Sequence, residues 1–173
     1  MRVLGIDPGS VTSGFGVVEG EGSRIGFVEA GHIGASSRLS FPERLKKMYD
    51  GIEAVISKHR PDAVAVENLF FARNVNSALK LGHARGVALL AAANSGLPIF
   101  EYTPTEIKQS VVGYGNAEKA QVRQMVKMLL KLSSLPEPLD ASDALACAIC
   151  HIHSARINET IRAATRGKSG RPV

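Results

Sequence analysis

The chain has 173 residues, of which 45% are hydrophobic and 21% charged, and it carries a formal net charge of +5 with a pI near 9.4. This composition is typical of one globular domain, and no apolar run reaches the roughly 18 to 20 residues that span a membrane. The excess of lysine and arginine favours an anionic partner such as nucleic acid. The N-terminus lacks the apolar segment of a signal peptide, so we expect a cytosolic protein.

The N-terminal third of the chain predicts a small sheet followed by a helix. Three β-like runs cover residues 2–7, 13–18 and 24–33, and the glycine-rich turns between them indicate an antiparallel meander. Ser40 and Glu43 then have the spacing of a capping box, with Pro42 in the first turn. This pattern predicts a helix that runs to about His59.

The remainder alternates between strand-like and helix-like segments. We expect strands at 63–67 and 98–102, and helices at 77–94, 104–112, 118–132 and 140–158. Gly82 and Gly86 share one face of the 77–94 helix, which could either pack closely against the sheet or line an interface between two copies of the chain; the sequence does not decide which. The order of elements predicts an α/β fold, with a mixed central sheet and helices on both faces. We expect residues 1–158 to form this domain and the basic segment 159–173 to be disordered.

Four carboxylates stand at element ends. Asp7 and Glu67 each end an apolar strand, where active sites of open α/β sheets gather. Asp140 and Asp143 fall on one face of the first turn of the last helix. Taken singly, Asp140 has the character of an N-cap and Glu67 could end its strand in solvent. Asp7 is harder to explain, because aspartate is disfavoured in strands and this one interrupts an apolar run.

A shared cluster of these four carboxylates predicts a metal site. Clustered carboxylates repel one another, and their hard oxygen atoms select Mg²⁺ or Mn²⁺. Two ions held roughly 3.5 to 4 Å apart by carboxylates suit in-line displacement at phosphorus. In a basic protein, such a site predicts a nuclease that hydrolyses phosphodiesters.

The segment CAICH, with Cys147 and Cys150, matches the haem-attachment signature C-x-x-C-H. Haem attachment would require export, and the segment reads as one continuous helix, so we reject that interpretation. A zinc site is also disfavoured, because His151 and His153 point to different faces of the helix. We expect all four side chains to be structural residues with satisfied partners.

The motifs GIDPGS, VAVENLFFARN and DASDALACAI resemble the active-site motifs of the RuvC family of bacterial Holliday junction resolvases. The segments SALKLGHARGVALLAA and EYTPTEIKQSVVGYGNAEKAQV resemble the same family, and the resemblance extends to about residue 158. It implies a ribonuclease H-like fold, a homodimer and Mg²⁺-dependent, symmetric nicking of four-way DNA junctions in recombination and repair. It also implies two metal ions per active site, 5′-phosphate ends, a T-rich cleavage site, and cooperation with a junction-binding protein and a branch-migration helicase.

The resemblance assigns roles to further residues. Asp7, Glu67, Asp140 and Asp143 would hold the metal, and Lys108 and Lys119 would contact the scissile phosphate or stabilise its charge. Phe70 would stack on an unpaired base at the junction, while Phe71 would belong to the core. DNA phosphates would be contacted by Arg73, Lys80 and Arg85, although each could equally be a plain surface charge.

Two other functions compete with this interpretation. An actin-like ATPase or sugar kinase also has an aspartate and a glycine-rich hairpin after its first strand, but such proteins duplicate the fold and are much longer. A non-catalytic nucleic-acid-binding module would be supported by the loss of a carboxylate, and all four are present.

Overall fold

The computed structural model describes residues 1–21, 24–36, 38–68 and 74–168. Its strands are β1 (Arg2–Asp7), β2 (Thr12–Glu21), β3 (Arg24–Gly34), β4 (Ala63–Glu67) and β5 (Ile99–Tyr102). Its helices are α1 (Phe41–His59), α2 (Val75–Asn94), α3 (Pro104–Val112), α4 (Lys119–Leu129) and α5 (Leu139–Lys168).

The strands form one five-stranded sheet in the order β3-β2-β1-β4-β5. The pairs β1–β2 and β2–β3 are antiparallel, which confirms the predicted meander, while β1–β4 and β4–β5 are parallel. Because β1 and β4 are parallel neighbours, their carboxyl ends meet at the same edge of the sheet.

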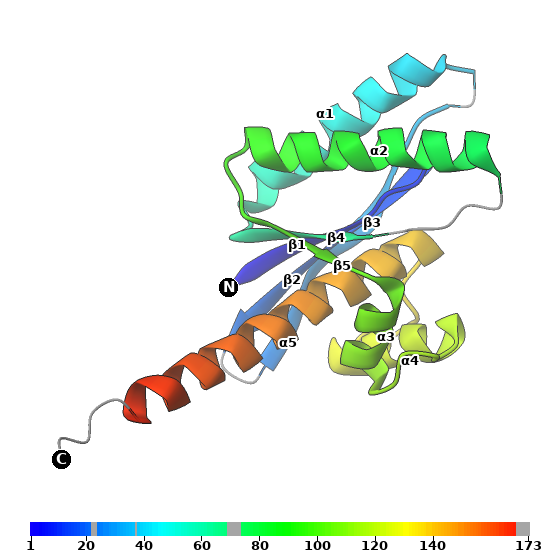
Figure 1. Ribbon diagram of the computed structural model, residues 1–173. Coiled ribbons are helices and arrows are strands. Elements are labelled where there is room, and N and C mark those ends of the chain that lie inside the picture. Colours follow the sequence, from blue (N-terminus) through cyan, green and yellow to red (C-terminus); the bar gives the residue numbers. More distant parts are fainter. Residues whose placement is uncertain (22–23, 37, 69–73, 169–173) are drawn as a thin grey trace.

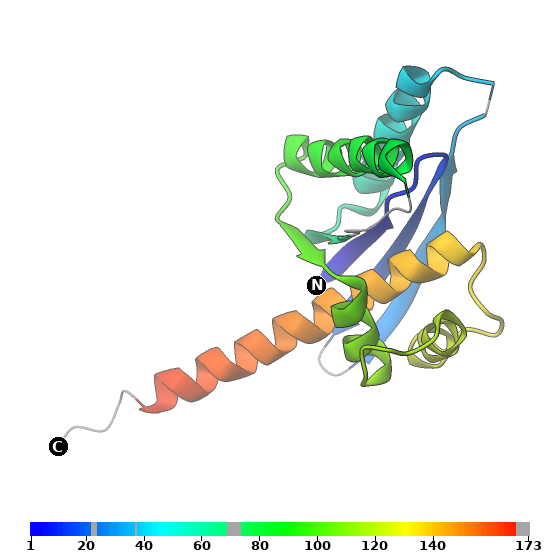
Figure 2. The same ribbon diagram turned by 45° about the vertical axis from the view of Figure 1, so that its right-hand side comes forward.

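Helices cover both faces of the sheet, as the sequence predicts. α1 and α2 lie on one face, and α5, α3 and α4 lie on the other (Figures 1 and 2). Each face has its own hydrophobic core: Ile6, Val17 and Met48 belong to the first, and Val18, Leu145 and Ile149 to the second. No helix among the described residues is both long and apolar enough to span a membrane.

Glycines allow the backbone of α5 to lie directly on β1 and β2. A Cβ atom added at Gly5 would lie 2.0 Å from the carbonyl oxygen of Ala144, and one added at Gly14 would lie 2.0 Å from that of Asp140. Real Cβ atoms do not approach oxygen so closely, so a larger residue would push the helix away. These glycines were not among the predicted packing positions, although glycines within strands are a signal of close backbone approach.

Of the two arrangements that the sequence left open for Gly82 and Gly86, packing against the sheet is excluded. Both are exposed, and a Cβ atom added at either one would meet no atom within 4 Å in the described structure. α2 instead packs through its buried alanines, Ala84, Ala88, Ala91 and Ala92. Alanine has a small apolar side chain that packs well, and it favours helix formation. Glycine has no side chain to pack, and it disfavours the helix.

The last helix is longer than predicted. α5 continues to Lys168, beyond the end predicted near Asn158. The division into a domain of residues 1–158 and a basic, disordered segment 159–173 stays a prediction. The segment contains alanine, arginine and glutamate, which are good helix formers, and a helix that is already nucleated extends at little cost. Its C-terminal part projects beyond the sheet (Figures 1 and 2).

The close approach of α5 predicts a large difference between two glycine substitutions. Gly5→Ala should lower the free energy of unfolding by about 1–3 kcal/mol or more, because its Cβ would overlap the α5 backbone. Gly26→Ala on β3 is the control, since its nearest neighbour would lie at an ordinary 3.8 Å. Urea unfolding of both variants measures the difference, and equal stability would contradict the packing described here.

Candidate active site

Two carboxylates lie side by side at the ends of parallel strands. Asp7 ends β1 and Glu67 ends β4, and the residues just before them, Ile6 and Val66, are paired in the sheet. The two strands are buried up to these residues, and the two carboxylates are themselves hydrogen-bonded to each other. The sheet therefore brings together two acidic groups that are sixty residues apart in the chain.

The other two carboxylates come from the first turns of α5. Asp143 lines the same cavity as Asp7 and Glu67, which has a volume of about 370 Å³. Asp140 lies over Gly14, the residue paired with Asp7, and its charge also acts on Asp7. The predicted cluster is therefore assembled, with Asp140 beside the cavity rather than among its lining residues.

Two lysines complete the cavity. Lys108 comes from α3, whose start is set by a capping box between Thr103 and Glu106, and Lys119 is the first residue of α4. The ammonium group of Lys119 donates a hydrogen bond of 2.7 Å to Asp143. Positive and negative groups therefore line one cavity, as the sequence analysis predicted for these residues.

The electrostatic cost of this arrangement is concentrated on Asp7. Burial, together with the negative charges of Glu67, Asp143 and Asp140, raises the pKa of Asp7 to about 8. Burial also raises the pKa of Glu67, although its hydrogen bond with Asp7 and the nearby lysines oppose the rise. Without a cation, the pair is thus most stable when Asp7 keeps a proton that it donates to Glu67.

The donor set suits a divalent cation of the magnesium type. The four acidic side chains offer carboxylate oxygens, which are hard ligands that Mg²⁺ prefers. Their negative charges repel one another, and a bound cation would reduce that repulsion. In the part of the chain that the structure describes, no three His, Cys, Asp or Glu side chains already surround one point closely enough to hold an ion.

The remaining predicted DNA contacts have different outcomes. Phe70, Phe71 and Arg73 lie outside the described residues, and Lys80 is exposed on α2. Arg85 forms an ion pair with Glu101 on β5, so its charge is already balanced within the protein. The roles of these residues in DNA binding stay predictions, and the ion pair weighs against Arg85.

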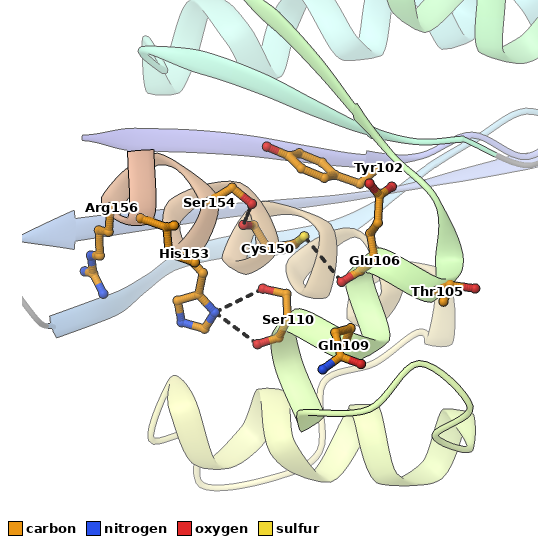
Figure 3. A pocket seen from close by; sticks show the side chains of 10 residues that line it. Tyr102, Thr105, Glu106, Gln109, Ser110, Cys150, His153, Ser154 and Arg156 are labelled. Atoms are coloured by element: carbon orange, nitrogen blue, oxygen red, sulfur yellow. Dashed lines mark hydrogen bonds between the residues drawn. The ribbon is translucent and has the colours of Figure 1, made fainter. Parts of the chain in front are cut away.

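The CAICHIH segment holds structural residues, as predicted. Cys147 and Cys150 are buried free cysteines, and the His151 ring contacts the hydroxyl of Tyr102 at 2.8 Å. His153 instead faces α3, where it bonds to Ser110 beside a cavity of about 750 Å³ (Figure 3). This larger cavity is separate from the one that holds the carboxylates, and the two are lined by different residues of α3 and α5.

A family model described as "Crossover junction endodeoxyribonuclease RuvC" matches residues 3–151 of the chain. The protein of that name from Citrifermentans bemidjiense is 54% identical over 158 residues, which cover 91% of this chain and 96% of that protein. The one from Ruminiclostridium cellulolyticum is 52% identical over 157 residues, covering 91% and 95% of the two chains.

Solved structures agree with these sequence matches. Thermus thermophilus RuvC superposes with a TM-score of 0.84 at 38% identity, covering 91% of this chain and 97% of that one. The T. thermophilus RuvC in complex with a Holliday junction substrate gives 0.87 at 37% identity, covering 91% and 96%. These matches confirm the predicted ribonuclease H-like fold.

The raised pKa of Asp7 predicts a pH-dependent cost to stability. Folded Asp7 keeps its proton to about pH 8, whereas the ordinary value is 3.8, so the folded state binds more protons between these two values. The free energy of unfolding of the metal-free protein should therefore fall as the pH rises from about 4 to 8. Asp7→Asn should remove this decline and raise the free energy of unfolding at pH 8 by about 1 kcal/mol or more.

Urea unfolding in EDTA at pH 5 and pH 8 measures this effect. Asp50→Asn is a suitable control, because Asp50 lies exposed on α1 in an ion pair with Lys46. An equal decline with pH in the wild type and in Asp7→Asn would show that Asp7 is not the source of the instability.

Proposed function

This chain belongs to the RuvC family of crossover junction endodeoxyribonucleases, and on that premise we propose that it resolves four-way DNA junctions by paired, symmetric nicks. The proposal is supported by the T. thermophilus relative whose structure was solved with a Holliday junction substrate. The observation that carries it is the cavity in which Asp7, Glu67 and Asp143 face Lys108 and Lys119. Such a set of charges suits a phosphodiester and the metal ions that cleave it.

We further propose that Asp7, Glu67, Asp140 and Asp143 hold Mg²⁺, with two ions per site and Mn²⁺ as a possible substitute. Bound divalent cations would activate the attacking water and stabilise the leaving oxygen. The negative charges around Asp7 oppose its ionisation and would attract a cation. Binding of a cation would therefore favour loss of the Asp7 proton. Lys108 and Lys119 would stabilise negative charge as it develops on the phosphate.

The other proposed partners follow from the family. We propose that the chain works with a junction-binding protein and a branch-migration helicase in recombination and repair. Since DNA lies in the cytoplasm of a bacterium, we also propose a cytoplasmic location. Phe70 would stack on a base at the junction, with Arg73 and Lys80 as contacts to phosphates.

A homodimer would place two such sites on one junction, and we propose the outer face of α2 as its interface. Exposed Val75, Leu79 and Leu90 lie on this helix with the exposed Gly82 and Gly86, at spacings that form one stripe. An exposed apolar stripe is typical of an interaction surface, and its glycines would let a second helix approach closely. A two-fold axis at this stripe would pair it with the same stripe of a second copy.

Cleavage of a synthetic four-way junction tests the proposed activity. Paired nicks should appear in Mg²⁺, disappear in excess EDTA and be absent from a linear duplex of the same sequences, as judged on a denaturing gel. Asp7→Asn and Glu67→Gln should each lower the cleavage rate about 10³-fold or more, because metal-assisted catalysis is worth several kcal/mol. Junction binding should be retained.

Asp50→Asn serves as the control, since this carboxylate lies on α1, on the other face of the sheet from α5. If the linear duplex is cut as fast as the four-way junction, the protein is a nuclease that does not select junctions. Binding without cutting, across junctions of many sequences, would instead indicate a non-catalytic module.

The proposed interface predicts a change of oligomeric state. Leu79→Glu combined with Gly86→Glu should convert a dimer to a monomer, because like charges would face each other across the two-fold axis. Light scattering after size-exclusion chromatography measures the mass. Met128→Glu is the control, since Met128 is a 68% exposed apolar residue of α4, away from the stripe. A double variant that stays dimeric would place the interface elsewhere.

A further inference from the structure

α3 is a short helix with limited apolar support. It spans Pro104–Val112 and buries only Ile107 and Val111 among its side chains. A helix of this length is not stable by itself in water, so its position depends on tertiary contacts. This matters because α3 carries Lys108 into the cavity that contains the carboxylates.

Behind α3, on the side away from the carboxylates, the packing is hollow. A cavity of about 750 Å³ lies beside the contact between α3 and the middle of α5 and is lined by Glu106, Gln109 and Ser110 on one side and by Cys150, His153 and Ser154 on the other (Figure 3). Ile107 and Val111 pack into the same hydrophobic core as α5. Beside the cavity this apolar packing is missing, so polar contacts hold the outer part of α3.

Hydrogen bonds from α5 cross this region. Nδ1 of His153 lies 3.1 Å from the carbonyl oxygen of Ser110 and 3.2 Å from its hydroxyl (Figure 3). A carbonyl only accepts, so Nδ1 carries the hydrogen and donates it. Cys150 also approaches the carbonyl of Glu106, at 3.8 Å, but a thiol is a weak donor. The imidazole of His153 is therefore the main polar link.

The acceptor is a carbonyl that the helix itself leaves free. Ser110 lies in the last turn of α3, where carbonyl oxygens have no partner within the helix. Lys108 precedes Ser110 by two residues, so the two side chains leave opposite sides of the helix. The histidine thus holds the back of α3 while the lysine faces the active site from its front.

We propose that His153 is a positioning residue for Lys108: by capping Ser110 across the cavity, it fixes α3 at the distance from α5 that places the lysine beside the carboxylates. The inference rests on the proposed function, because it assigns Lys108 a part in cleavage. It requires no contact between His153 and the DNA or the metal.

A double-mutant cycle tests the proposal. Under single-turnover conditions with saturating protein, His153→Phe should slow junction cleavage about tenfold to a hundredfold, the effect of a small displacement of a catalytic group. Phenylalanine keeps a planar aromatic ring, slightly larger than imidazole, and removes both ring nitrogens, including the Nδ1–H donor. His153→Asn supplies an amide donor and should recover most of the rate. In a Lys108→Ala background, His153→Phe should change the remaining rate less than twofold.

Amide hydrogen exchange gives a readout that does not depend on cleavage. His153→Phe should raise exchange in α3 and leave α1 unchanged. The control is His59→Ala, which removes a histidine bonded to Glu29 at 2.6 Å on the α1 side of the sheet; it should leave α3 exchange and the cleavage rate unchanged.

The outcomes separate the two proposals. If His153→Phe slows the Lys108→Ala variant as much as the wild type, His153 acts on the fold in general and the positioning role is overturned. Unchanged exchange in α3 would overturn it as well. If the wild-type chain cuts no junction, the proposed function fails, while hydrogen exchange still decides whether His153 holds α3.

Discussion

The structure depends on the close contact between the backbone of α5 and the glycines of β1 and β2. Because Gly5 and Gly14 have no side chains, the first turns of α5 lie against the sheet at a distance that no other residue would allow. Asp140 and Asp143 belong to those turns, and Asp7 ends the strand beneath them. The same contact that builds one of the two cores therefore sets the geometry of the carboxylates.

The contact between α5 and the sheet has two opposing effects on the stability of the fold. The apolar side chains of α5 are buried against the sheet, and their burial favours folding. The carboxylates at the end of that interface are partly desolvated and repel one another, which raises the pKa of Asp7 to about 8. Strongly perturbed pKa values cluster at functional sites, and the unfavourable charge here would favour the binding of a cation.

The two sides of the active site are held by different interactions. The carboxylates stand on strands and on a helix packed at van der Waals distance, so their positions are determined by the cores. Lys108 stands on a short helix beside a cavity, and a histidine hydrogen bond reaches that helix from α5. Hydrogen bonds depend on direction, so this link can orient α3 beside the cavity, beyond the core contacts of Ile107 and Val111.

The sequence by itself determined the sheet, most of the helices and the four carboxylates. Strand and helix periodicity are local properties, and an acidic residue that ends an apolar strand is visible without coordinates. Only the tertiary structure decided which way Gly82 and Gly86 face, that Arg85 pairs with Glu101, and that His153 reaches Ser110. The physical reason is that each of these depends on contacts between segments far apart in the chain, and periodicity within one segment does not specify its partner.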